Sequence, residues 1–140
     1  MSSSSRNQES TIVAAPVWDL IRSLEFKWWT QVTTAKVEGT AAEVGSLRTV
    51  TFKDGTVQKF KVLELSDLDH FITYEVIESN PSAQYFSAVH TLRLRKVTTP
   101  KEQTFVEWSS EFATENSTAN VVEDSKFKKR EAFEDLVKHI

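Results

Sequence analysis

The sequence contains no cysteine and only three glycines and three prolines among its 140 residues. The lack of cysteine excludes a disulfide framework, a thiolate nucleophile and a cysteine-ligated zinc site, and it suits a reducing compartment. Because glycine and proline are the residues that most often interrupt regular structure, their scarcity predicts long strands and helices.

Two further absences concern membranes and nucleic acids. No apolar run approaches the roughly 20 residues that a membrane-spanning helix needs, so we expect no transmembrane segment. Seventeen Lys and Arg residues against twenty Asp and Glu residues give a net charge of −3, which provides no bulk attraction to nucleic acid. The start, MSSSSRNQES, lacks the basic and apolar segments of a secretory signal, and we therefore expect a cytoplasmic protein.

Aromatic residues, in contrast, are abundant: nine Phe, four Trp and two Tyr. Hydrophobic residues make up 39% of the chain and charged residues 26%, a balance typical of one globular unit with its own core. We expect residues 1–140 to form a single domain.

Hydrophobic spacing predicts a short helix near the start of the chain. Pro16 is followed by apolar residues at helical spacing up to Leu24, which indicates an amphipathic helix, and residues 10–14 could form a strand before it. The aromatic segment 25–31 is interpreted as a second short helix or helical turn.

From residue 32 the period changes to two, which predicts consecutive antiparallel strands over 32–38, 44–53, 56–65, 71–78, 84–97 and 102–114. Asp54-Gly55 between two alternating runs is a strong hairpin signal. Residues 119–140 then predict a long terminal helix with an inward stripe of Phe127, Arg130, Phe133, Val137 and Ile140. The fold class is α+β, with the helix packed on the concave face of the sheet.

Strand alternation places Arg48 on the inward face with Val50 and Phe52. One interpretation is a packed core from whose edge Arg48 extends its guanidinium to water. The other is a ligand cavity with aromatic walls and a few polar groups, since small-molecule sites have that composition. The polar groups would be Arg48, Tyr74, Tyr85, Ser87 and Ser110.

The order of elements, with Val17-Trp-Asp-Leu-Ile-Arg22 near the start and Gly45-Ser-Leu-Arg48 opening a strand, resembles the START-like superfamily. This superfamily, also called SRPBCC, includes the birch pollen allergen fold, polyketide cyclase/dehydrase-like proteins, plant abscisic-acid receptors and lachrymatory-factor synthase. The resemblance implies a helix-grip fold: a curved antiparallel sheet of six or seven strands wrapped on a long C-terminal helix, with two short helices after the first strand. It also implies a cavity for lipids, sterols or polyketide-like molecules, and Tyr85-Phe-Ser87 looks like the Tyr-x-Ser that lines the pocket in the hormone receptors.

Several segments depart from these relatives. Trp28-Trp29 stands where the hormone receptors have a Tyr-Lys whose lysine meets the ligand carboxylate. The turn at Lys53-Asp54-Gly55 replaces their gate, and the segment 78–82 replaces their latch. Phe60 stands where lachrymatory-factor synthase has an acid. Neither hormone-receptor activity nor that acid chemistry is expected here.

No motif indicates a metal or a cofactor, and we expect neither. No catalytic motif is found either, which favours binding over catalysis but leaves enzyme activity open. His70 and His139 are expected at the surface, and the orientation of His90 stays open. A metal site at Asp67, Asp69 and His70 has no chelating spacing to support it, and the basic segment 126–130 is interpreted as a solvated helix face.

The leading hypothesis is a domain that binds a hydrophobic or amphipathic small molecule and is a monomer or weak homodimer. A polyketide cyclase/dehydrase-type enzyme and a co-chaperone-like interaction module are the alternatives. The residues expected to contact the ligand are Arg48, Val50, Phe52, Phe60, Val62, Tyr74, Val76, Tyr85, Ser87, Trp108, Ser110, Phe112, Phe127 and Arg130.

Overall fold

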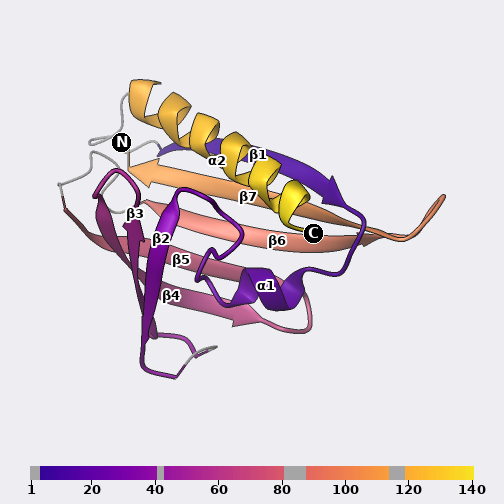
Figure 1. Ribbon diagram of the computed structural model, residues 1–140, viewed down its shortest axis with the longest axis horizontal. Helices are drawn as coiled ribbons and strands as arrows, with labels where there is room; N and C mark the ends of the chain where they lie inside the picture. Colours follow the sequence, from indigo (N-terminus) through magenta and orange to yellow (C-terminus); the bar gives the residue numbers. More distant parts are fainter. Residues whose placement is uncertain (1–3, 41–42, 81–87, 114–118) are drawn as a thin grey trace.

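The structure is a computed structural model that describes residues 4–40, 43–80, 88–113 and 119–140 (Figure 1). Its elements follow one another in the order β1 Ser4–Val13, α1 Trp18–Arg22, β2 Val32–Glu38, β3 Leu47–Phe52, β4 Val57–Ser66, β5 Phe71–Asn80, β6 Val89–Val97, β7 Gln103–Ala113 and α2 Ala119–His139. The predicted strands and terminal helix are therefore present, with shifted ends.

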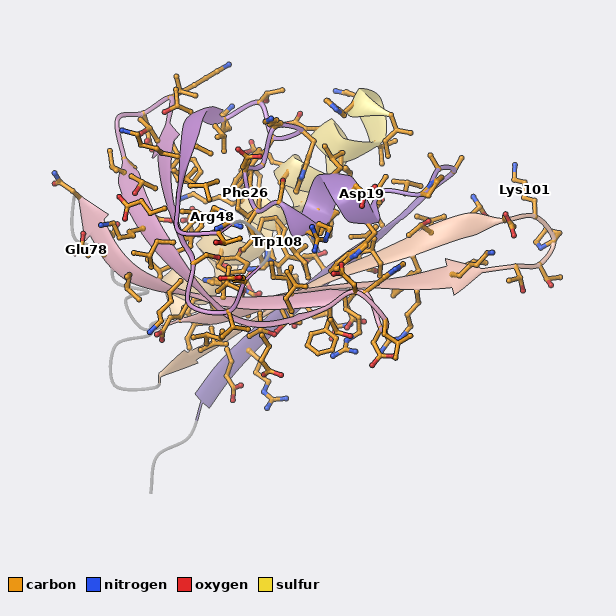
Figure 2. The ribbon with its side chains drawn as sticks, turned by 90° about the horizontal axis from the view of Figure 1, so that it is seen from below. Asp19, Phe26, Arg48, Glu78, Lys101 and Trp108 are labelled. Carbon is orange, nitrogen blue, oxygen red and sulfur yellow. The ribbon has the colours of Figure 1, made fainter. Side chains whose placement is uncertain are left out.

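The seven strands form one antiparallel sheet in the order β1-β7-β6-β5-β4-β3-β2. Strands β2 to β7 form a meander, and β1 pairs with β7 at the far edge. Both helices lie on the same face of the curved sheet (Figures 1 and 2). This is the predicted α+β helix-grip architecture. Neither helix in the described part of the chain is long and apolar enough to cross a membrane.

The turn between β3 and β4 is the predicted Asp54-Gly55 hairpin. Gly55 has a φ of +90°, which a glycine adopts without steric cost. The Asp54 carboxylate accepts a hydrogen bond from the Thr56 backbone N–H at 2.9 Å, and this bond lowers the pKa of Asp54. The turn holds Asp54 and Thr56 at the end of the sheet where the cavity described below opens.

The second short helix expected over residues 25–31 is not present. Leu24 and Phe26 have positive φ angles of 51° and 52°, and such left-handed residues end a right-handed run of hydrogen bonds. Two turns replace the helix, closed by hydrogen bonds from Trp29 N–H to the Phe26 carbonyl and from Val32 N–H to the Trp29 carbonyl, both 3.0 Å. These turns bury Phe26, Trp28 and Trp29 in the core.

The predicted inward stripe of α2 is also wrong, except at Phe133. The side chains expected inside are exposed: Phe127 by 60%, and Val137 and Ile140 by 48% each. Arg130 lies on the surface as well. The face of α2 that packs on the sheet consists of Lys129, Ala132, Phe133 and Leu136. Hydrophobicity placed the stripe on the wrong side because the true face contains a lysine and a small alanine.

The inward faces of the strands agree with the alternation. Val50, Val62 and Ile72 are completely buried, and Tyr74, Trp108 and Phe112 are buried nearly as deeply. Because strand side chains alternate strictly between two faces, one correct register fixes the orientation of the whole strand. Five of these six residues belong to one continuous core between the sheet and α2, and Phe112 forms a second, smaller cluster with Ala88.

Candidate ligand-binding cavity

A cavity of about 260 Å³ lies between the concave face of the sheet and α2. Its apolar walls are Phe26, Trp29, Phe52, Phe60, Val76 and Trp108. Its buried polar groups come from Gln58, Tyr74, His90 and Lys129, whereas Gln31, Asp54 and Glu131 are exposed at its rim. The arrangement therefore combines an aromatic interior with a few polar groups and a charged opening.

The aromatic wall is built from the strands and from the turns after α1. The Trp108 ring on β7 stacks on Phe26 at a centroid distance of 5.8 Å and meets Trp29 edge-on at 5.7 Å. Figure 2 shows Phe26 and Trp108 in the middle of the molecule, between sheet and helices. Such ring pairs add to the stability gained from burial. They therefore hold the turns after α1 in place against the sheet as part of the cavity wall.

Tyr74 and His90 form a polar group on neighbouring strands β5 and β6. The Tyr74 hydroxyl accepts a hydrogen bond of 3.2 Å from the Trp108 indole N–H, and the His90 ring stacks on Tyr74 at 5.0 Å. His90 Nδ1 is hydrogen-bonded to the Ser110 hydroxyl. Burial raises the pKa of Tyr74, and burial together with the charge of Lys129 lowers the pKa of His90 well below its usual value. Both side chains are therefore neutral at physiological pH.

Lys129 reaches the cavity from α2. It is only 3% exposed, its Nζ donates a hydrogen bond of 2.7 Å to the Ser125 hydroxyl one turn earlier, and it lies 5.4 Å from the centre of the Trp108 ring. Burial lowers the pKa of Lys129 to about 7, although Glu9 acts in the opposite direction. Lys129 belongs to the basic segment 126–130, whose charges predict a solvated helix face, and its burial is therefore not predicted from the sequence.

Arg48 is completely buried, but it does not line the cavity. Its Nε donates to the Ser23 carbonyl at 2.8 Å, and Nη1 donates to the Ser46 hydroxyl at 3.0 Å and the Leu47 carbonyl at 3.3 Å. Burial lowers the pKa of Arg48, partly offset by Glu25. The guanidinium thus joins the segment after α1 to the start of β3.

The predicted contact residues fall into four groups. Five line the cavity, namely Phe52, Phe60, Tyr74, Val76 and Trp108. Five others are buried in the core outside the cavity wall, namely Arg48, Val50, Val62, Ser110 and Phe112. Phe127 and Arg130 are exposed on α2, and Tyr85 and Ser87 lie outside the described residues.

Five deep lining residues were absent from the predicted set, namely Phe26, Trp29, Gln58, His90 and Lys129. Strand parity carried the signal for two of them: Gln58 lies two residues before Phe60 on β4, and His90 lies two residues before Leu92 on β6. No comparable sequence signal places Phe26 or Trp29, whose positions depend on left-handed turns.

The loop that holds Asp67, Asp69 and His70 has a different role from metal binding. Asp67 accepts hydrogen bonds from Arg22 at 2.8 and 2.9 Å and from the Trp18 indole at 2.7 Å, which lower its pKa. His70 is exposed, as expected, and stacks on Trp18 at 4.9 Å. No group of three metal-binding side chains occurs among residues 4–40, 43–80, 88–113 and 119–140. These contacts fasten α1 to this loop, which connects β4 and β5.

Solved structures share this architecture over nearly the whole chain, although no family model and no curated protein sequence matches it. A protein of Nitrosospira multiformis is 26% identical over 96% of this chain and 94% of that chain, with a TM-score of 0.79. The protein XoxI from Bacillus cereus is 16% identical over 96% and 94% of the two chains, with a TM-score of 0.80.

Ginseng major latex-like protein 151, from Panax ginseng, is 18% identical over 97% of both chains, with a TM-score of 0.72. Its fold is of the birch pollen allergen type, in which a long C-terminal helix is held against a curved antiparallel sheet. The chain is thus similar, over nearly its whole length, to proteins with the helix-grip fold.

Proposed function

We propose that this protein is a single ligand-binding domain that holds a hydrophobic or amphipathic small molecule, such as a lipid-, sterol- or polyketide-like compound, in the cavity beneath α2. The supporting observation is the cavity of about 260 Å³ with six apolar or aromatic walls and buried polar groups at Tyr74, His90 and Lys129. Apolar walls with a few placed polar groups are typical of small-molecule sites.

The volume limits the size of the ligand. The cavity of about 260 Å³ lies just below the range of roughly 300 to 1,000 Å³ that is typical of small-molecule pockets. A two-ring aromatic compound or a medium-length chain matches this space and the aromatic walls. A complete sterol requires the cavity to widen or the ligand to extend through the rim at Asp54 and Glu131.

Binding is better supported than the two alternatives. A general base works best with a pKa near the operating pH, whereas the pKa of His90 is far below it and its Nδ1 is already bonded to Ser110. An interaction module would favour an exposed aromatic patch, and Phe127 is the one aromatic residue among the strongly exposed large hydrophobic side chains in the described part of the chain.

A matched pair of variants tests the proposed function. Val76→Phe fills the cavity from β5, and Ile77→Phe adds the same bulk on the opposite face of the same strand. Titration with Prodan, a neutral apolar dye built on the two rings of naphthalene, is expected to saturate for the wild type and for Ile77→Phe and to fail for Val76→Phe. Circular dichroism checks that each variant melts cooperatively.

A second measurement uses the wild type alone. The indole N–H resonance of Trp108, assigned with Trp108→Phe, should shift when dye binds, because the ring lines the cavity. The absence of saturable binding by the folded wild-type protein would refute the proposal.

A further inference from the structure

We propose that the ligand of this cavity carries a carboxylate, and that the ammonium group of Lys129 pairs with it. The inference rests on the proposed function, because it concerns the polar end of a molecule bound in the same cavity. The apolar part of that molecule would lie against the aromatic wall formed by Phe26, Phe60 and Trp108.

The position of Lys129 is unusual for a lysine on a surface helix. Lysines normally cover apolar surface with their methylene groups and keep the charged end in water. Here the residue is 3% exposed and its side chain lines the cavity instead. An ammonium group has three N–H donors, and the Ser125 hydroxyl is the one acceptor within hydrogen-bonding distance of Nζ among the described residues. Donors therefore remain for a ligand.

No carboxylate in the described parts of the chain comes within 4 Å of Lys129 Nζ. Glu9 on β1 is the nearest acid to influence it, but Glu9 pairs with Arg130 at 3.0 Å and with Lys126 at 4.0 Å. Asp124 on α2 pairs at 3.0 Å with Lys128, a second and half-buried lysine that also lines the cavity. The protein thus buries this cation without supplying a counter-ion of its own.

None of the other groups around the cavity provides a counter-ion for Lys129. Tyr74 on β5 and His90 on β6 are neutral, and β7 contributes the uncharged face of Trp108. Asp54 in the β3–β4 turn and Glu131 on α2 lie at the exposed rim, where water and salt screen their charges. Burying a cation is costly unless it is paired. A ligand carboxylate would provide that pair, and a neutral head group would not.

This pairing has a consequence for protons. With a pKa of about 7, Lys129 loses its proton as the pH rises above neutrality. A bound carboxylate favours the charged form of the lysine. The complex should therefore take up a proton when it forms at pH 8, and the affinity for the acid should fall by up to about tenfold per pH unit above the pKa of the free protein.

The experiment uses the full chain and two ligands of equal size, naphthalene carboxylate and its uncharged carboxamide. At pH 6.5 we expect the wild type to bind the carboxylate about tenfold or more tightly than the carboxamide. Lys129→Met should lose this preference and bind the carboxylate no more tightly than the carboxamide. Arg130→Met, which removes the neighbouring exposed cation, should behave like the wild type.

Calorimetry of the wild type at pH 8 in two buffers of different ionisation enthalpy gives the proton uptake without any variant. A value approaching one proton per carboxylate bound, and none for the carboxamide, supports the inference. Equal affinity of the wild type for the two compounds, or no proton uptake, would overturn it and leave the proposed function intact. Failure of both compounds to bind would instead refute the proposed function.

Discussion

Two cations are buried in the described part of this protein, and they are held in opposite ways. Arg48 is completely buried beside the segment after α1, where two backbone carbonyls and the Ser46 hydroxyl accept its hydrogen bonds. Lys129 is 3% exposed beneath α2, where the Ser125 hydroxyl is its one described acceptor. Figure 2 shows the guanidinium of Arg48 lying among the elements of the core.

The difference shows that burial of a charge does not by itself identify a binding residue. A planar guanidinium with several fixed donors suits a permanent tie between backbone segments, whereas a lysine amine is compact and changes its pKa readily when buried. Among the described residues, the protein supplies three acceptors to Arg48, whose Nη2 alone is left without one, and a single acceptor to Lys129. By this criterion Arg48 is structural and Lys129 is available to a ligand.

The largest effect should come from Arg48→Ala. This change leaves the Ser23 and Leu47 carbonyls without their donor and opens a cavity in the core, so we expect a loss of about 3 kcal/mol or more in the free energy of unfolding. Urea titration followed by tryptophan fluorescence measures it. An unchanged midpoint would mean that Arg48 is not a structural tie, and the contrast with Lys129 would disappear.

Lys129→Met should have the opposite sign. The folded-state pKa of about 7 lies below the ordinary value of 10.5, so the unfolded chain binds a proton between these values that the folded chain does not. Wild-type stability is therefore lowest below pH 7 and recovers as the pH rises towards 10.5. We expect the variant to be more stable by roughly 2 to 4 kcal/mol at pH 6, an order-of-magnitude conversion of the shift.

The same urea titration, repeated at pH 6, 8 and 10, measures this gain for Lys129→Met. The gain should shrink steadily across the series, because the wild type regains its stability as the lysine loses its proton. A variant that is less stable than the wild type at pH 6 would show that Lys129 is held by interactions comparable with those of Arg48.

His90 gives a smaller effect that sharpens the same contrast. Its folded-state pKa lies well below 6.5, so only the unfolded chain takes up this proton as the pH falls below 6.5. Stability should fall by up to about 1.4 kcal/mol per pH unit in that range. His90→Gln should remove this slope. Lys129→Met should leave the start of the loss near pH 6.5 and reduce its total size, because without the repelling charge the folded-state pKa of His90 is less strongly lowered.

The smallest effect is expected for Arg130→Met, on the outer side of the same helix. Its side chain is 61% exposed and its ion pair with Glu9 is open to water. Exposed pairs contribute little, so the free energy of unfolding should change by no more than about 0.5 kcal/mol. A change as large as that of Lys129→Met would mean that the charge of the helix, rather than burial, controls stability.

The sequence predicted the strands better than the helix surfaces, for a physical reason. The inward positions of Val50, Tyr74 and Trp108 follow from a two-residue period that allows only two orientations. A helix can present any of several faces to the sheet, so the rotation of α2 about its axis is harder to predict. Hydrophobicity suggests that Phe127 is buried and Lys129 exposed, whereas Phe127 is exposed and Lys129 is buried.

The candidate site was predicted in part. Its strand residues Phe60, Tyr74 and Trp108 follow from alternation, but Phe26 reaches the cavity through left-handed turns that no local pattern predicts. The separation of Arg48 from the cavity depends on the Ser23 carbonyl, 25 positions away along the chain. Such long-range contacts are set by the folded structure as a whole.

The pairing of β1 with β7 also bears on the order in which the molecule folds. Arg6 on β1 meets Glu111 on β7, 105 positions later, whereas β2 to β6 each pair with the next strand along the chain. Contacts between distant residues form slowly because a long loop must close first. The N-terminal strand must therefore wait for the last strand, and the Asn7 side-chain amide then donates a 3.0 Å hydrogen bond to the Val122 carbonyl of α2. Pulsed hydrogen exchange during refolding should protect β4 and β5 before β1, so that the two ends of the chain close the cavity over a sheet that has already formed.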